Sequence, residues 1–333
     1  HFDGHQPLAS QNGLCPTSRT SYSWEDPAWP IKPDIVMEGG NYACSPSGRI
    51  EGCDDLSLLT TTLTPTGRLL TLSSDTSAAS AQAARLAAIL MADYPGLWPE
   101  TIRGLIVHSA EWTEEMNRQV PGDSQAEIHK RLRCFGYGVP NLDRARYTVE
   151  NCVSLVHQGT IQPYKRDGSV AKTNHYIRHS LPWPEAALKQ LHAQDVTVKI
   201  TLSYFIEPSP QRRGWGNKFR YASHGLRFAL QGPIEKERSF MQRISSQEWE
   251  EEEGRPSTSD PIKWELGRNL RTKGSIHCDW WTSSAADVAE CGQVAVFPVT
   301  GWWKERKHLR CVEKQARYSL IITISTPATD VDL

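Results

Sequence analysis

Ser77 lies in the stretch of the chain whose residue types best fit a catalytic role. Residues 73–91 read SSDTSAASAQAARLAAILM, so small hydroxylic residues lead directly into an alanine-rich run. Ala, Leu, Arg, Gln and Met favour helix, and Ser and Asp favour the N-cap. A hydroxyl at a helix start lies beside unpaired backbone N–H groups and the positive end of the helix dipole. Such a site suits a serine that attacks a carbonyl, because the developing oxyanion is stabilised there. The alternative is a serine that only caps the helix.

Three stretches in order resemble the subtilisin-like serine proteases, the subtilases. Thr76-Ser77-Ala78-Ala79 resembles their Gly-Thr-Ser-x-Ala nucleophile motif. Residues 94–110 are similar to the Pro-bounded turn and second helix that follow this motif, and residues 31–40 resemble the strand and turn that precede it. The resemblance covers residues 18–150. It implies that Ser77 forms an acyl-enzyme after a histidine, oriented by an aspartate, removes its proton.

The sequence departs from the subtilase motif at Asp75. The family has glycine there, which implies a tight backbone or close packing. An ionised aspartate would place a negative charge near the forming oxyanion and oppose catalysis, unless Asp75 only caps the helix and points to solvent. Asp75 therefore keeps a second hypothesis open, in which the chain is an inactive pseudoprotease or interaction module.

In subtilases the catalytic aspartate and histidine precede the serine in the sequence. In this chain, the segment before Ser77 is too short to contain both motifs. We therefore expect them, and the oxyanion asparagine, upstream of His1, so that this chain is a C-terminal fragment that is inactive alone. His1, Asp3 and His5 are too close together in the sequence to be the separate motifs of the catalytic aspartate and histidine. In subtilases a strand lies between the oxyanion asparagine and the segment that corresponds to residues 18–21, whereas Asn12 lies in the loop directly before that segment.

Other residues could be proposed as a base or nucleophile, but structural roles explain them better. His108 lies on an apolar helix face and is expected to be a satisfied core histidine. His224 and His277 are expected to be turn or sheet residues. A set of His277, Cys278 and Asp279 is disfavoured because adjacent residues of a strand point to opposite faces. The pairs 280–281 and 302–303 are tryptophans that are expected to pack rather than to stack on a ligand.

Composition excludes several classes of protein. The 333 residues carry a formal net charge of −1, which does not favour a nucleic-acid binder. No apolar run is long enough for a membrane span. The eight cysteines form no Cys-x-x-Cys pair, so neither a zinc site nor a disulfide scaffold is indicated. No cofactor is predicted, and reduced thiols favour a cytoplasmic protein.

The hydrophobic pattern predicts an α/β fold in two parts. We expect residues 1–155 to be the C-terminal part of a subtilase parallel-sheet catalytic domain, and residues 156–333 to be an antiparallel β-sandwich. The predicted strands are 31–37, 68–72, 196–205, 226–230, 293–299 and 318–324. The predicted helices are 78–91, 99–110 and 140–147. Residues 115–130 and the acidic insert 247–261 are predicted to be solvated loops.

Four segments in the second half resemble one subgroup of subtilases. They are residues 202–208, 223–228, 274–279 and 301–304. The subgroup consists of bacterial cytoplasmic subtilases found beside a gene for a AAA-type ATPase. The resemblance implies an ATPase partner and a protein or peptide substrate.

Overall fold

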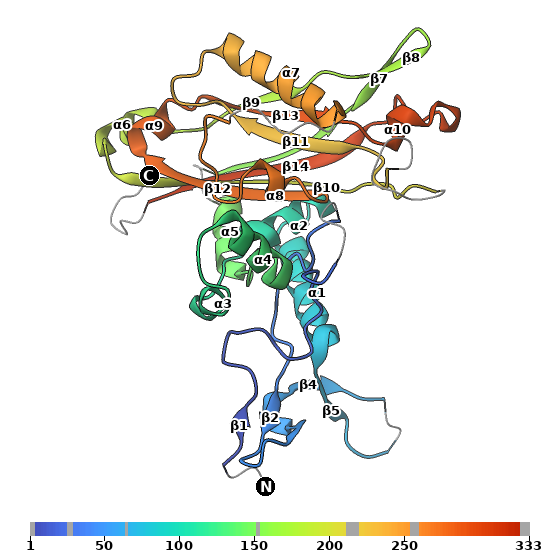
Figure 1. Ribbon diagram of the computed structural model, residues 1–333, viewed down its shortest axis with the longest axis vertical. Coiled ribbons are helices and arrows are strands. Elements are labelled where there is room, and N and C mark those ends of the chain that lie inside the picture. Colours follow the sequence, from blue (N-terminus) through green and yellow to red (C-terminus); the bar gives the residue numbers. More distant parts are fainter. Residues whose placement is uncertain are drawn as a thin grey trace. The chain divides into compact units, whose positions relative to one another are not determined.

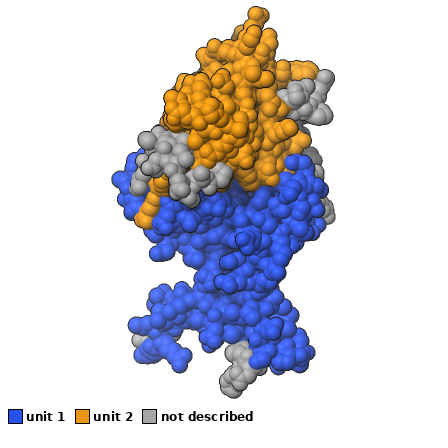
Figure 2. Space-filling view, turned by 90° about the vertical axis from the view of Figure 1, so that its left-hand side faces the viewer, with its two compact units in different colours: residues 1–96, 109–144 blue, residues 97–108, 145–333 orange. Residues whose placement is uncertain are grey.

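The chain forms two compact units. The computed structural model describes residues 4–24, 29–63, 66–150, 154–210, 220–253 and 260–326. Unit 1 comprises residues 1–96 and 109–144, and unit 2 comprises residues 97–108 and 145–333 (Figure 2). The chain therefore enters unit 2 at Leu97, returns to unit 1 at Ser109, and enters unit 2 again at Ala145.

Unit 1 combines short antiparallel strands with helices (Figure 1). A three-stranded sheet has the order β1 (Gln6–Pro7), β2 (Tyr42–Cys44), β3 (Ile50–Gly52), and a ribbon pairs β4 (Leu58–Thr61) with β5 (Leu70–Ser73). A 3-10 turn, η1 (Asp54–Leu56), joins β3 to β4. The helices are α1 (Asp75–Asp93), α3 (Glu114–Gln119), α4 (Gln125–Phe135) and the start of α5 (Leu142–Glu150). The strand predicted at 68–72 and the helices predicted at 78–91 and 140–147 are therefore present.

Two predictions for unit 1 are wrong. Residues 31–37 form no strand, because this segment makes single backbone bonds, from Val36 to Gly138 and from Tyr137 to Asp34, and Pro33 has no N–H to donate. Residues 115–130 are mostly helical. A capping box explains the start of α4: Ser124 accepts from the N–H of Glu127, and the Glu127 carboxylate accepts from the N–H of Ser124.

Unit 2 contains two antiparallel sheets, one of four strands in the order β12-β10-β14-β6 and one of three in the order β11-β13-β9. The four strands are β6 (Leu155–Ile161), β10 (Asp195–Tyr204), β12 (Ile276–Ser284) and β14 (Ala316–Ser325). The three are β9 (Ile177–Ser180), β11 (Gly225–Leu230) and β13 (Gln293–Val299). A separate hairpin pairs β7 (Tyr164–Asp167) with β8 (Val170–Thr173). All four strands predicted after residue 195 are present.

Both sheets of unit 2 contribute to one hydrophobic core. Alternate residues of β10, including Val198, Ile200 and Leu202, are fully buried with Phe228 of β11 and Leu320 of β14. The opposite face of β10 and β14 receives α2 (Pro99–His108), the helix predicted at 99–110. Among its described residues, unit 2 also contains most of α5 and the helices α6 (Glu185–Leu191), α7 (Glu237–Glu253), α8 (Arg268–Arg271), α9 (Ala285–Ala289), α10 (Trp302–Glu305) and the 3-10 turn η3 (Lys307–Leu309).

The mixture of helices and strands fits the predicted α/β class. Every strand pair among the described residues is antiparallel, and the parallel sheet expected within residues 1–155 is not seen there. The described strands of unit 1 have two to four residues, and β2–β3 and β4–β5 are hairpins, a connection that produces antiparallel pairing.

Candidate active site

Ser77 lies in the first turn of α1, as the sequence predicted. The helix begins at Asp75 after the N-cap residue Ser74, whose side chain makes no capping bond. The first four N–H groups of a helix lack intrahelical partners, so the N–H of Ser77 is free of the helix ladder. The Ser77 side chain is exposed, whereas that of Ala78 is buried. The Ser77 hydroxyl and backbone N–H therefore both lie at an exposed helix start.

A segment from residues 38 to 40 holds the start of α1. The N–H of Asp75 donates to the carbonyl oxygen of Gly39 at 2.7 Å, and the side-chain amide of Gln82 donates to the carbonyl oxygen of Glu38 at 2.7 Å. Gly40 has φ 77°, and a Cβ there would lie 2.9 Å from the Leu56 carbonyl oxygen. Only glycine fits this close approach, so the turn predicted after residue 37 is a fixed support for the serine helix.

Asp75 adopts a backbone conformation that explains the glycine of the subtilase motif. Its φ is 72°, in the left-handed region that glycine enters freely and that aspartate and asparagine tolerate better than other residues. The side chain is exposed and makes no hydrogen bond within the described residues, so Asp75 does not cap the helix. The turn is therefore kept, and what the substitution adds is a carboxylate two residues before Ser77.

The described histidines of unit 1 make contacts away from Ser77. His5 pairs with Glu51 at 3.0 Å, and His129 accepts from Nε of Arg133 at 2.9 Å. His1 and Asp3 lie outside the described residues. Thr113 donates to the carbonyl oxygen of Asn12. Among the described residues of unit 1, the structure thus pairs no imidazole with the Ser77 hydroxyl.

His108 is a satisfied core histidine, as predicted. Its side chain is buried, and its two ring nitrogens lie 2.8 Å from the hydroxyls of Thr201 and Thr323. Burial, with a smaller effect of Lys199, holds the pKa of His108 well below its ordinary value. A neutral ring can donate to one threonine and accept from the other, and it is not available as a base.

His224 and His277 are also structural. The His224 ring stacks on Trp303, and Nδ1 lies 3.0 Å from the Ser223 hydroxyl. His277 Nε2 lies 3.2 Å from the Gly274 carbonyl oxygen. Burial lowers the pKa of His224 to about 3 and holds that of His277 well below its ordinary value. Both rings are neutral near pH 7 and enclosed by unit 2.

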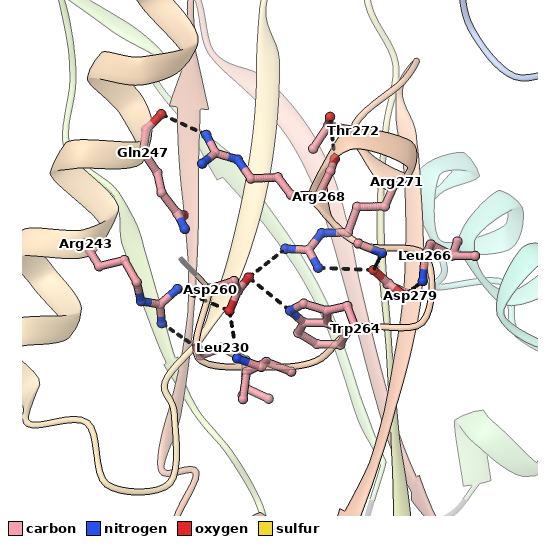
Figure 3. Close-up of polar contacts among 12 residues, drawn as sticks. Leu230, Arg243, Gln247, Asp260, Trp264, Leu266, Arg268, Arg271, Thr272 and Asp279 are labelled. Atoms are coloured by element: carbon pink, nitrogen blue, oxygen red, sulfur yellow. Dashed lines mark hydrogen bonds and ion pairs between the residues drawn. The ribbon is translucent and has the colours of Figure 1, made fainter. Parts of the chain in front are cut away.

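The set of His277, Cys278 and Asp279 is not a catalytic site. Asp279 is fully buried and accepts from the N–H groups of Leu266 and Gly267 and from Arg271 at 3.1 Å (Figure 3). These bonds fasten the loop before α8 to β12. Burial outweighs Arg271 and raises the pKa of Asp279 to about 6. Sequence reasoning missed this ion pair, although an acidic residue inside an apolar strand was a signal for it.

The acidic insert is not the solvated loop that was predicted. α7 extends to Glu253, and Glu250 is buried and paired with Arg268 at 3.2 Å. Residues 254–259 lie outside the described part. Trp302 and Trp303 are buried, and both indole N–H groups donate to Glu207, so the packing role predicted for this pair is confirmed.

Comparison with known proteins supports the resemblance to subtilases. Residues 7–138 match the model of the subtilase family. This range contains Ser77, the supporting segment 38–40 and α2. The chain is also similar to a protein of Sinorhizobium fredii (strain NBRC 101917 / NGR234) described as uncharacterized protein y4bN. The two are 26% identical over 203 residues, which cover 60% of this chain and 42% of the relative. The chain thus spans less than half of that relative's length.

Two structural features are absent from the part of the chain that the structure describes. No group of three or more His, Cys, Asp or Glu side chains in these ranges is arranged to hold a metal ion. None of the helices in the same ranges combines the length and apolar character needed to cross a membrane.

Proposed function

We propose that the chain is part of a serine endopeptidase in which Ser77 is the nucleophile. The observation that carries the proposal is the subtilase match over residues 7–138, with Ser77 exposed in the first turn of α1, where the helix ladder leaves its N–H without a partner. The supporting segment at Gly39 and Gly40 adds to it, because a nucleophile needs a fixed position.

The proposed reaction proceeds through an acyl-enzyme. Ser77 Oγ attacks the peptide carbonyl carbon while a histidine takes its proton, and the N–H groups at the helix start stabilise the oxyanion. The C–N bond then breaks, and the histidine returns the proton to the leaving amine. Water hydrolyses the ester and restores the hydroxyl. We place the histidine, its aspartate and the oxyanion asparagine in a segment upstream of His1, because His5 and His129 are bound elsewhere.

The wider proposal follows the subgroup resemblance. Residues 1–155 would complete a parallel-sheet catalytic domain together with that upstream segment, and residues 156–333 would be a β-sandwich accessory domain. The protein would act in the cytoplasm on protein or peptide substrates, with a AAA-type ATPase as its partner.

Active-site labelling tests the proposal. The natural full-length protein is treated with a fluorophosphonate, and its intact mass is recorded. The matched controls are Ser77→Ala and Ser80→Ala, because Ser80 lies one turn further along the same helix and its hydroxyl donates to the Thr76 carbonyl oxygen at 2.7 Å. We expect one adduct, formed by loss of fluoride, in wild type and Ser80→Ala, and none in Ser77→Ala.

The absence of labelling would be equally informative. If the folded protein stays unlabelled both alone and with the ATPase and ATP, the endopeptidase proposal is wrong. Labelling that appears only with the ATPase would instead identify the ATPase as an activator.

A further inference from the structure

Two histidines of unit 2 face its hydrophobic core from the edge strands of different sheets. His157 of β6 lies opposite Leu320 of β14, and His179 of β9 lies opposite Val294 of β13. Opposed residues of antiparallel strands project from the same face of a sheet, and Leu320 and Val294 are both fully buried in the shared core. The two imidazoles therefore occupy positions where the strand pattern calls for apolar side chains, and both are half-buried.

The two imidazoles meet each other and the phenol ring of Tyr318, a residue of β14. The ring centroids of His157 and His179 are 4.3 Å apart, and those of His157 and Tyr318 are 5.7 Å apart. Nε2 of His179 lies 2.9 Å from the Tyr318 hydroxyl oxygen. Three polar side chains from three strands and both sheets are thus gathered at one place on the side of the core where β6 and β9 lie.

Gly159 of β6 leaves a small space beside these rings. It lies opposite Tyr318, and a Cβ at this position would be 2.6 Å from Nε2 of His157 and 3.1 Å from the Tyr318 hydroxyl oxygen. Both atoms therefore border the same space, which a larger residue would fill. Glycine weakens a strand, and inside one it often marks the close approach of a ligand or of another backbone.

The atoms around this space suit a transition-metal ion. Imidazole nitrogen is a preferred ligand of zinc, copper and nickel, and the metal binds the neutral ring. Burial lowers the pKa of His157, and burial with a smaller effect of His157 lowers the pKa of His179 to about 4, so both rings are neutral near pH 7. Ligand atoms of a tetrahedral zinc ion lie about 3.4 Å from one another, close to the 2.9 Å between His179 and Tyr318.

We propose that His157, His179 and Tyr318 bind a divalent transition-metal ion, with Zn²⁺ as the expected ion. The ion links β6 and β14 of one sheet to β9 of the other, and water occupies its remaining coordination position. Because the third ligand is a phenol oxygen, this cluster is not one of the groups of three His, Cys, Asp or Glu that are absent from the described residues. All three ligands belong to unit 2, so the proposal is independent of the reaction at Ser77.

Zinc titration of the natural full-length protein tests the proposal. The protein is first freed of metal with a chelator and then titrated with Zn²⁺ in a calorimeter, and its thermal unfolding is recorded with and without the ion. His179→Ala removes one ligand, whereas Gly159→Ala keeps all three and fills the space beside them. His175→Ala is the matched control, because His175 is an exposed histidine of the same unit and lies beside Lys165.

Wild type and His175→Ala should bind one equivalent of Zn²⁺ roughly 100-fold more tightly than His179→Ala and Gly159→Ala, because loss of a ligand costs at least as much affinity as loss of a group that orients one. Zinc should raise the melting temperature of wild type and His175→Ala, since an ion that binds only the folded state stabilises it, and should leave the other two variants unchanged. Co²⁺ in place of Zn²⁺ should give a visible absorption band that Tyr318→Phe alters.

Two results would overturn the proposal. One is equal zinc affinity in wild type and Gly159→Ala, which would place the ion at other side chains. The other is a folded wild type that binds no zinc, which would leave the three rings with a packing role only. Circular dichroism without zinc checks that each variant is folded; if His179→Ala is not, Gly159→Ala and His179→Gln decide, and equal affinity in both and wild type would again overturn the proposal.

Discussion

Acid should destabilise unit 2 through His224. This side chain is 2% exposed, and its ring stacks on Trp303 with the centroids 4.8 Å apart. Burial lowers its pKa from the ordinary value of 6.5 to about 3. The cause is that an imidazolium here would lose its water and gain no carboxylate partner among the described residues.

The two pKa values of His224, folded and unfolded, determine whether acid raises or lowers the stability of unit 2. Between the folded value of about 3 and the unfolded value of 6.5, the unfolded chain binds a proton that the folded chain does not. The contribution to stability is complete above pH 6.5 and is lost as the pH falls. Each pH unit corresponds to about 1.4 kcal/mol, so His224 alone should remove about 2 kcal/mol by about pH 5.

Urea unfolding of the chain, followed by far-UV circular dichroism at about pH 8 and about pH 5, measures this contribution. His224→Asn keeps a polar group beside Ser223 but cannot take up the proton. At about pH 8 it should be less stable than wild type by about 1 kcal/mol, because the ring contact with Trp303 is lost. By about pH 5 the variant should be more stable than wild type by a similar amount, because only wild type loses stability through the proton that unfolded His224 binds.

His308→Asn is the matched control, because His308 is an exposed histidine of the same unit. Its free energy of unfolding should follow wild type at both pH values. The reasoning would be refuted if the difference between His224→Asn and wild type stayed constant from about pH 8 to about pH 5.

Three other substitutions test the site and the core. Asp75→Asn keeps a residue that tolerates φ 72° but removes the charge, and it should raise the labelling rate of Ser77 roughly tenfold, because charges a few ångströms apart near a surface interact by on the order of 1–4 kcal/mol; an unchanged rate would show that the carboxylate does not oppose the oxyanion. Gly40→Ala should destabilise unit 1 by about 2 kcal/mol more than Gly48→Ala in urea unfolding, because Gly48 has a similar φ of 82° but open space around its Cβ position; equal effects would contradict the close approach. Asp279→Asn should lower the free energy of unfolding by about 3 kcal/mol, since it removes the buried carboxylate 3.1 Å from Arg271 and leaves the guanidinium paired with Asp260 at 3.5 Å; a loss below about 1 kcal/mol would contradict that.

The sequence predicted the helices and strands that have a clear local pattern of helix-forming or alternating apolar residues. The alanine-rich run before Met91 indicated a helix, and the alternating runs after residue 195 indicated four strands with bounds correct to within about two residues. The prediction failed where a local signal was passed over. Ser124 and Glu127 form a capping box whose spacing is visible in the sequence, yet the segment was assigned to a loop for its polarity.

Ion pairs between residues far apart in the chain could not be predicted from the sequence. Glu100 and Arg317 are separated by 217 positions, and neither has neighbours that indicate an ion pair. Glu250 lies in an acidic run that is typical of a solvated segment, but only its distant partner Arg268 decides that it is buried. Such contacts depend on how elements pack, and composition within a window of the chain carries no information on that.

Whether the protein is an active protease or an inactive relative depends, as far as Asp75 is concerned, on the charge of its carboxylate. A residue that could not adopt φ 72° would disturb the turn, its bond to Gly39 and the direction in which α1 leaves. Aspartate is among the few residues that adopt this conformation at small cost, so the geometry around Ser77 is retained. Loss of function by distortion of the backbone is therefore not what this substitution produces. What differs from the subtilase motif is a negative charge near the site where the oxyanion forms, and a charge can be neutralised by a partner, by a bound cation or by protonation. If the protein is active, the residues that complete its site must offset the Asp75 carboxylate, and a cationic side chain facing Asp75 is the feature to look for in the full-length protein.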